Sequence, residues 1–244
     1  MHGLGAVLWR EYLFFRRRWW TITTSSMVAP LLYLVAFGWG LGKTVNMDGV
    51  SYIDFLVPGV IALSTMNVSF NAVATPTSIA RLYDKTLEEY LVAPITMFYF
   101  AMGKILAGAL RGVYAAIIIL IIAFFFGANF HLNLLFFALL FLNCLVFSSL
   151  GFVVALKIKS HPDMARFNSF VITPMLFICG TFFSLSQVPG TLQLFINALP
   201  LTPASHGLRA VALGTALPLW APAIQMLYLV VLVGAGLRIC NKVE

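Results

Sequence analysis

The chain has 244 residues, of which 61% are hydrophobic and only 9% are charged, and its formal net charge is +7. Soluble domains carry roughly 25% charged and about 45–50% apolar residues, so this composition excludes a water-soluble fold and indicates an integral membrane protein. The positive charge is better explained by cytoplasmic loops than by nucleic acid, which is not an expected partner.

The first expected element is an amphipathic helix over residues 1–20. Its charged residues are Arg10, Glu11, Arg16, Arg17 and Arg18. At 100° per residue Leu4, Leu8 and Tyr12 share one face and Arg17 lies opposite, whereas Glu11 falls on the apolar side and breaks the pattern. The pattern predicts an interfacial helix whose arginines face anionic lipid. The alternative is an extension of the first span into the cytosol.

Six apolar segments are long enough to cross a bilayer with some tilt. They predict an all-α membrane protein made of a single domain over residues 1–244. Spans one and two are expected within 21–75, spans three and four within 104–156, span five over 167–183, and span six over 219–237.

A short charged helix is predicted over residues 78–92, between spans two and three, and Pro94 ends it. Its charged and tyrosine residues are Arg81, Tyr83, Asp84, Lys85, Glu88, Glu89 and Tyr90. The charges alternate at i,i+3 and i,i+4 spacing, which stabilises a helix. A solvated linker helix would show the same charges, but tyrosine is enriched at protein interfaces and favours a docking surface.

Span three carries two cations, Lys104 and Arg111, on one stripe about 10 Å apart along the helix. Charged side chains inside a span are costly and often functional. We expect Lys104 to extend to the cytoplasmic headgroups. For Arg111 two interpretations stay open: the same extension, or a position facing the protein interior or an anionic substrate group.

Residues 184–218 hold one charged residue, Arg209, and are interrupted by Pro189, Pro200, Pro203 and Pro218. The segment is too apolar for a solvated loop and too broken for a span. It predicts two short re-entrant helices, about 191–199 and 204–213, enclosed by protein. A seventh span is the alternative, and the Pro-Leu-Thr-Pro break at 200–203 argues against it.

The distribution of positive charge predicts the orientation. With six spans, 13 of the 15 lysines and arginines fall on the side of the termini, and only Lys43 and Arg209 fall on the other. Cytoplasmic loops are enriched in these residues, so both termini and the charged helix are expected in the cytoplasm.

No pattern typical of an enzyme or a metal site is found. The run ending in Gly42-Lys43-Thr44 resembles a phosphate-binding loop, but Phe37 replaces its first glycine and a membrane span precedes it; a close helix contact through Gly38 and Gly42 is the better interpretation. The four histidines and three cysteines lack ligand spacing. We therefore expect no catalytic residue and no cofactor in this chain.

Three stretches resemble the ABC-2 type transporter permeases. The first is the charged helix followed by LVAPITMFYFAMGKILAG at 91–108, with Pro94 and Gly103-Lys104. The second, and most specific, is CGTFFSLSQVPGTLQLFINALPLTPASHGLRAVALG at 179–214, which contains Gly180, Pro189, Pro200, Pro203 and Arg209. The third is the basic aromatic N-terminal helix. The resemblance covers nearly the whole chain.

The resemblance implies a transmembrane subunit of an ATP-driven exporter in a bacterial cytoplasmic membrane. Two copies would form the path for an amphipathic or lipid-linked substrate, such as a drug, polysaccharide or lipo-oligosaccharide. Two separate ATPase subunits would bind ATP and magnesium, and residues 81–90 would be the helix that couples them to the permease. Expected path-lining residues are Ser64, Asn67, Asn71, Arg111, Phe177, Phe182 and Phe183. The alternative is a membrane scaffold or assembly protein without a transport path.

Overall fold

The computed structural model describes residues 2–40, 46–47, 49–83, 96–128, 131–185 and 188–240. These residues are almost entirely helical, with one two-stranded hairpin formed by β1 (Asn46–Met47) and β2 (Val50–Ser51). Within the described chain, five helices are long and apolar enough to cross a membrane: Gly3–Gly38, Tyr52–Leu82, Met97–Phe125, Leu134–Lys157 and Trp220–Cys240. The predicted all-α membrane fold is therefore confirmed.

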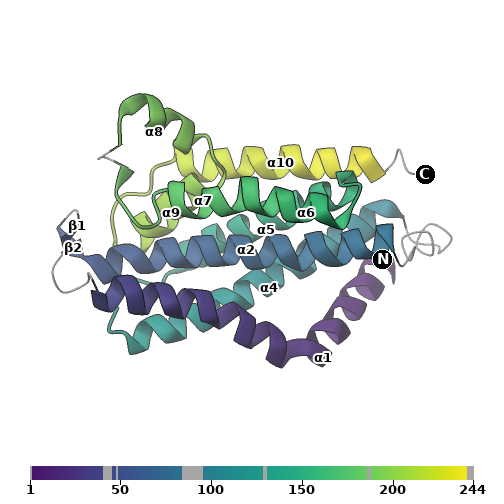
Figure 1. Cartoon of the computed structure of the whole chain (residues 1–244), viewed down its shortest axis with the longest axis horizontal. Helices are drawn as coiled ribbons and strands as arrows, with labels where there is room; N and C mark the ends of the chain where they lie inside the picture. The colour runs from purple at the N-terminus through teal and green to yellow at the C-terminus, as the bar shows by residue number, and fades with distance from the viewer. Residues whose placement is uncertain are drawn as a thin grey trace.

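The helices run alternately up and down one bundle, and both ends of the chain lie at the same end of it (Figure 1). The long elements are α1 (His2–Tyr33), continued by the π-helical turn η1 (Leu34–Trp39), then α2 (Tyr52–Leu82), α4 (Met97–Phe125), α5 (Leu134–Lys157) and α10 (Trp220–Cys240). We call the end that holds the two termini the terminal end and the opposite one the hairpin end.

The predicted fifth span corresponds to a helical run assembled from three pieces: α6 (His161–Phe167), the π-helical η2 (Asn168–Ile172) and α7 (Thr173–Ile178). Pro174 opens α7 and has no N–H for the carbonyl four residues earlier, and the wider π turn lies directly before it. The helix ends at Ile178, short of the predicted Phe183, and Gly180 then adopts a positive φ of 68°. This run is not among the five apolar spans, because it begins with polar residues.

One predicted helix boundary lies close to a break in the structure, and another is wrong. The N-terminal helix was expected to end at residue 20, and α1 consists of two helices joined across a kink at Arg18 (φ −120°, ψ 15°); the part before the kink, which we call the arm of α1, turns away from the bundle direction (Figure 1). In contrast, α2 does not end at residue 75 but continues through Pro76 to Leu82. Its last turns stay helical because Thr77 and Ser78 are buried against the bundle, not exposed to solvent.

The core lies along α2 and α5. In the most apolar stretch of each of these helices 78% of the residues are buried, whereas the corresponding shares are only 22% in α1 and 17% in α10. Small residues bring the central helices together. A Cβ on Gly112 of α4 would lie 2.0 Å from Ser69 Oγ, and one on Gly151 of α5 would lie 2.6 Å from the Phe70 carbonyl oxygen. Van der Waals contact at small residues is the usual basis of helix packing in membranes.

A polar cluster ties three helices together inside this core. Asn143 of α5 donates to the Ala62 carbonyl (3.2 Å) and to Thr65 Oγ1 (3.0 Å) of α2, and it accepts from Gln225 Nε2 of α10 (3.3 Å). All three polar side chains are buried. The cluster gives α10, which has few buried residues, a specific register on α5.

Candidate functional site

The terminal end of α2 is fastened to the end of α5 by Arg81. Its guanidinium donates to the carbonyl oxygens of Ala155 (3.0 Å), Leu156 and Ile158 (3.0 Å). These are among the last carbonyls of α5, which have no partner within the helix, and a cation is favoured at the negative end of the helix dipole. The ends of α2 and α5 are therefore linked through one side chain.

The remaining residues of the predicted coupling helix come after Arg81 in the sequence. Tyr83 is exposed at the C-cap of α2. Asp84, Lys85, Glu88, Glu89 and Tyr90 lie outside the described residues, and so do Lys43 and Thr44 of the glycine-rich run. Gly38 of that run is not a tight contact, because a Cβ there would meet only Ile53, at 3.7 Å.

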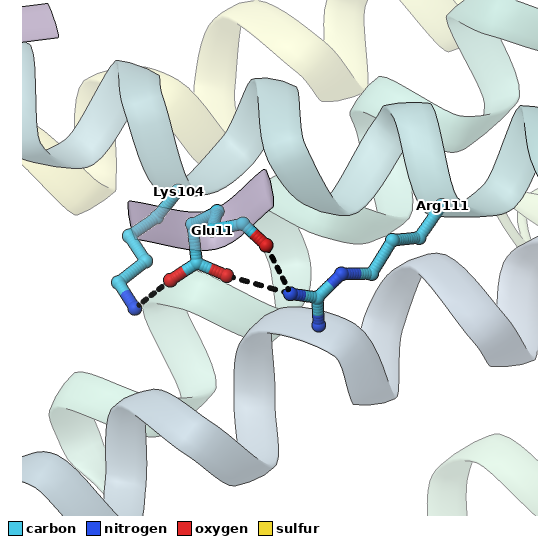
Figure 2. Close-up of polar contacts among 3 residues, drawn as sticks. All are labelled: Glu11, Lys104 and Arg111. Atoms are coloured by element: carbon cyan, nitrogen blue, oxygen red, sulfur yellow. Dashed lines mark hydrogen bonds and ion pairs between the residues drawn. The ribbon is translucent and has the colours of Figure 1, made fainter. Parts of the chain in front are cut away.

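The arm of α1 is held against α4 by a buried ionic cluster of three residues (Figure 2). Glu11 Oε1 lies 2.5 Å from Lys104 Nζ, and Glu11 Oε2 lies 2.8 Å from Arg111 Nη2. The exposed fractions of the three side chains are only 8–11%. One turn further toward the N-terminus, Val7 packs on Gly103, where a Cβ would lie 2.6 Å from Val7 Cγ1. The Gly103-Lys104 pair thus provides a small-residue contact and an ion pair for the same arm.

This cluster corrects one prediction and decides another. The expectation that Lys104 extends to the headgroups is wrong, because its amine is buried on Glu11. Of the two interpretations of Arg111, the structure supports the one that faces the protein interior. Glu11 seemed to break the amphipathic pattern of the first helix. It lies on the same face as Leu4 and Leu8, and this face contacts α4, where the two cations are its partners. A lone acid on an apolar face, with two cations seven residues apart in a later span, was the available signal.

The arginines of the arm stay outside the ionic cluster. Arg10, Arg16, Arg17 and Arg18 are exposed, as are Trp19 and Trp20 just after the kink. This distribution fits a helix at a membrane surface, whose contact with lipid stays a prediction.

The residues predicted to line a substrate path do not form one site. Asn67 and Asn71 of α2 are joined by a 2.7 Å hydrogen bond from Asn71 Nδ2 to Asn67 Oδ1, and with Arg111 they line a cavity of about 400 Å³ beside the kink of α1. Ser64 is buried, and its hydroxyl has no hydrogen-bond partner in the described part of the chain.

The aromatic members of the predicted path lie after and within α7. Phe182 packs against Phe177 (ring centroids 6.0 Å apart) and against Tyr33 and Phe37 of the first helix. Phe177 is half exposed. The predicted path residues therefore fall into a polar group at the kink and an aromatic group elsewhere in the bundle.

The segment 184–218 contains two helices, α8 (Gly190–Asn197) and α9 (Leu201–Ala212), close to the predicted positions. Pro189 and Pro200 are their N-caps, and Pro203 lies in the first turn of α9, where no N–H is needed. The Thr202 hydroxyl donates to the Ile196 carbonyl (2.6 Å) across the break. Prolines at these positions are compatible with the start of a helix. The segment therefore forms two short helices separated by a break, and not one continuous span.

Arg209 of α9 is buried at the hairpin end among backbone carbonyls. Its Nε donates to Phe55 O (3.1 Å), its Nη2 donates to Gly180 O (2.9 Å) and Thr181 O (3.3 Å), and its Cζ lies 3.7 Å from the centroid of the Phe55 ring. Two predicted residues of this segment, Gly180 and Arg209, are thus in contact. The role of Gly59 was not predicted: a Cβ there would lie 2.9 Å from Thr181 O and 3.0 Å from Arg209 Nη2.

The described residues contain no group of three or more histidine, cysteine or acidic side chains that could hold a metal ion. The three cysteines, Cys144, Cys179 and Cys240, are buried and free. The buried polar contacts of Glu11, Asn143 and Arg209 position helices against one another.

Comparison with known proteins agrees with this architecture. The family model described as ABC-2 type transporter matches residues 2–213. Nodulation protein J of Rhizobium meliloti (strain 1021) is 31% identical over 214 residues, which are 87% of this chain and 82% of that protein. The inner membrane transport permease YadH of Escherichia coli (strain K12) is 30% identical over 87% of this chain and 83% of its own length. Nodulation protein J of Bradyrhizobium diazoefficiens is 32% identical over 85% and 80%. The chain therefore belongs to the ABC-2 type transporter family and is a transmembrane permease.

Proposed function

We propose that this chain is the permease subunit of an ATP-driven exporter that moves an amphipathic or lipid-linked substrate out of the cytoplasm. A separate ATPase subunit would bind ATP and magnesium, and two copies of the chain would enclose the path. Membership of the family carries the proposal. The name of the YadH relative, an inner membrane transport permease, supports transport across a bacterial inner membrane.

The alternating helices support the topology. We take the run His161–Ile178 as the crossing that completes six, because it lies alongside the other helices and connects the two ends of the bundle (Figure 1). Six crossings place both termini on one side, which the excess of lysine and arginine assigns to the cytoplasm. In this topology α8 and α9 would form the re-entrant pair near the outer face.

The structure of α2 supports the coupling role of residues 81–90. Its 31 residues form one helix about 46 Å long, which ends directly before the charged segment. Arg81 joins this end to α5, and Asn143 joins α5 to the middle of α2 and to α10. A force applied at the end of α2 would therefore move packed helices as a unit.

The test is reconstitution with the partner ATPase in liposomes. We expect Glu88→Lys combined with Glu89→Lys to abolish stimulation of ATP hydrolysis by the permease, because the docking charges are reversed. The exposed Lys159 at the same end provides a matched reversal, Lys159→Glu, which should retain stimulation. Unchanged stimulation in the double variant would refute the coupling role.

A labelling experiment tests the orientation separately. The native cysteines are buried, so a Lys85→Cys variant provides one selective target for a membrane-impermeant maleimide. Labelling in inverted vesicles but not in intact cells is expected. Reaction from the outer face alone would place the charged segment beyond the reach of a cytoplasmic ATPase.

A further inference from the structure

The strongest unassigned feature is the cavity of about 400 Å³ between the kink of α1 and the middle of α2. Its wall combines polar and apolar side chains. The polar ones are Arg18, Thr21, Ser25 and Ser26 of α1, Asn67, Asn71 and Thr75 of α2, and Arg111 of α4. Apolar side chains, among them Phe14, Ile22 and Val68, line the rest. A cavity of this mixed character suggests a ligand with both a polar group and an apolar part.

The charge of the wall specifies the sign of that group. Arg18 and Arg111 are its charged members, and the wall that the structure describes contains no carboxylate. Arg111 is 92% buried, since its exposed fraction is 8%. The nearest acid, Glu11, binds both Arg111 and Lys104, so the three-residue cluster keeps an excess of one positive charge.

The hydrogen-bonding capacity of Arg111 is only partly used. In the described chain its hydrogen bonds go to Glu11 alone, and both come from Nη2. A guanidinium has five N–H donors in a planar fork suited to oxyanions. The Phe14 ring lies 5.2 Å from Cζ of Arg18 and 5.2 Å from Cζ of Arg111, and this aromatic contact holds the two cations on one side of the cavity.

A second cavity adjoins the same arginine, and its wall is more apolar than that of the first. It measures about 530 Å³ and lies between the arm of α1 and α4, with Leu8, Tyr12, Phe15 and Tyr114 in its wall. Arg111 lines both this cavity and the cavity beside the kink of α1. A molecule with an anionic head and an apolar body would match the two neighbouring surfaces.

From these contacts we propose that the cavity beside the kink binds an oxyanion, of the phosphate class, through Arg18 and Arg111, with the Asn67 amide as a further hydrogen-bond donor; Asn71 holds Asn67 in place through hydrogen bonds to its carbonyl oxygen and to its Oδ1. The oxyanion belongs to an amphiphile whose apolar part lies along the arm of α1. The proposal concerns equilibrium binding to the permease alone. It does not require the partner ATPase or net transport, so it can fail while the proposed function stands.

The experiment measures binding to the purified full chain in detergent by native mass spectrometry and by thermal shift. Three probes are compared: phosphatidylglycerol, the zwitterionic phosphatidylcholine, and inorganic pyrophosphate. Selective binding of phosphatidylglycerol is expected, whereas saturable binding of pyrophosphate alone would show a site for a free oxyanion and would overturn the assignment to an amphiphile. Equal retention of both lipids together with no effect of pyrophosphate would overturn the proposal.

Variants locate the site without disturbing the buried ion pairs. We expect Arg18→Gln to weaken binding roughly tenfold, the usual effect of losing one charge-assisted hydrogen bond, and Asn67→Leu to weaken it less. Arg16→Gln removes the same charge two residues away on the exposed arm, outside the cavity wall, and should leave affinity unchanged. If Arg16→Gln weakens binding as much as Arg18→Gln, the attraction is general to the basic arm, and the assignment to the cavity is wrong.

Discussion

Glu11 and Arg111 are one hundred residues apart in the sequence, yet their side chains meet at 2.8 Å in the interior of the protein. Replacing Glu11 with Ala leaves two buried cations, Lys104 and Arg111, without their anion. Loss of one partner of a buried pair is worth about 3–5 kcal/mol. We expect Glu11→Ala to lower the thermal midpoint in detergent strongly, and Arg16→Ala on the exposed side of the same arm to leave it nearly unchanged.

Neutralising one residue of each charge offers a sharper check on this cluster. Glu11→Gln combined with Lys104→Met removes one charge of each sign and leaves one glutamine beside Arg111. It should be less destabilised than Glu11→Ala. If both variants are as stable as the parent, the cluster does not hold the arm.

The helix contact at Gly112 leads to a second prediction. A methyl group there would overlap Ser69 Oγ (2.0 Å) and Cys144 Sγ (2.7 Å), both on buried central helices. Overpacking of this kind costs about 1–3 kcal/mol. Gly112→Ala should therefore lower stability, whereas Gly234→Ala in α10 should not, because a Cβ at Gly234 meets nothing within 4 Å. Equal thermal midpoints for the two variants would contradict the packing.

Periodicity and composition predicted the helices well, but not the contacts between them. The positions of α8 and α9 followed from prolines, which act locally. The end of α2 was missed because tertiary burial kept Thr77 and Ser78 helical, and no local signal marks such burial. The pairing of Glu11 with Lys104 joins distant parts of the chain, and it becomes visible only when the arm is placed on α4. The contacts of Asn143 were not predicted because a lone asparagine in a span has no distinctive sequence pattern.

The cluster around Asn143 gives a third prediction, best measured as a double-mutant cycle. Asn143→Ala removes the hydrogen bonds to α2 and also the acceptor of Gln225 Nε2. Hydrogen bonds between membrane helices average about 0.6 kcal/mol, with a maximum near 1.7. We expect Asn143→Ala and Gln225→Ala to be non-additive in the free energy of unfolding by a value in that range. Strict additivity would show that the two amides do not interact.

The start of α6 gives a fourth prediction. Ser160 is its N-cap: the hydroxyl accepts from the Asp163 N–H (3.4 Å) and donates to Asp163 Oδ2 (2.7 Å). Ser160→Ala should cost about 1 kcal/mol and accelerate hydrogen exchange over residues 161–166. Ser160→Asn, another good N-cap, should restore protection; if exchange is unchanged in Ser160→Ala, the cap does not stabilise α6.

The site of Arg209 leads to the last prediction, because it joins three segments of the chain. Its guanidinium contacts the carbonyl of Phe55 in the first turn of α2 and those of Gly180 and Thr181 after α7. Lysine keeps the charge but has a single ammonium group and cannot present a planar fork to carbonyls on different sides. Arg209→Lys should therefore loosen the packing of α9 on α2, seen as faster hydrogen exchange at residues 201–212. Gly59→Ala should act similarly from the other side, since its methyl group would press on both Thr181 O and Arg209 Nη2. Gly190→Ala, at a glycine with nothing within 4 Å of a Cβ, is the matched control. If Arg209→Lys and Gly59→Ala both leave hydrogen exchange over α9 unaltered, the guanidinium does not hold this helix in place. A positive charge at position 209, without the planar fork, would then be sufficient.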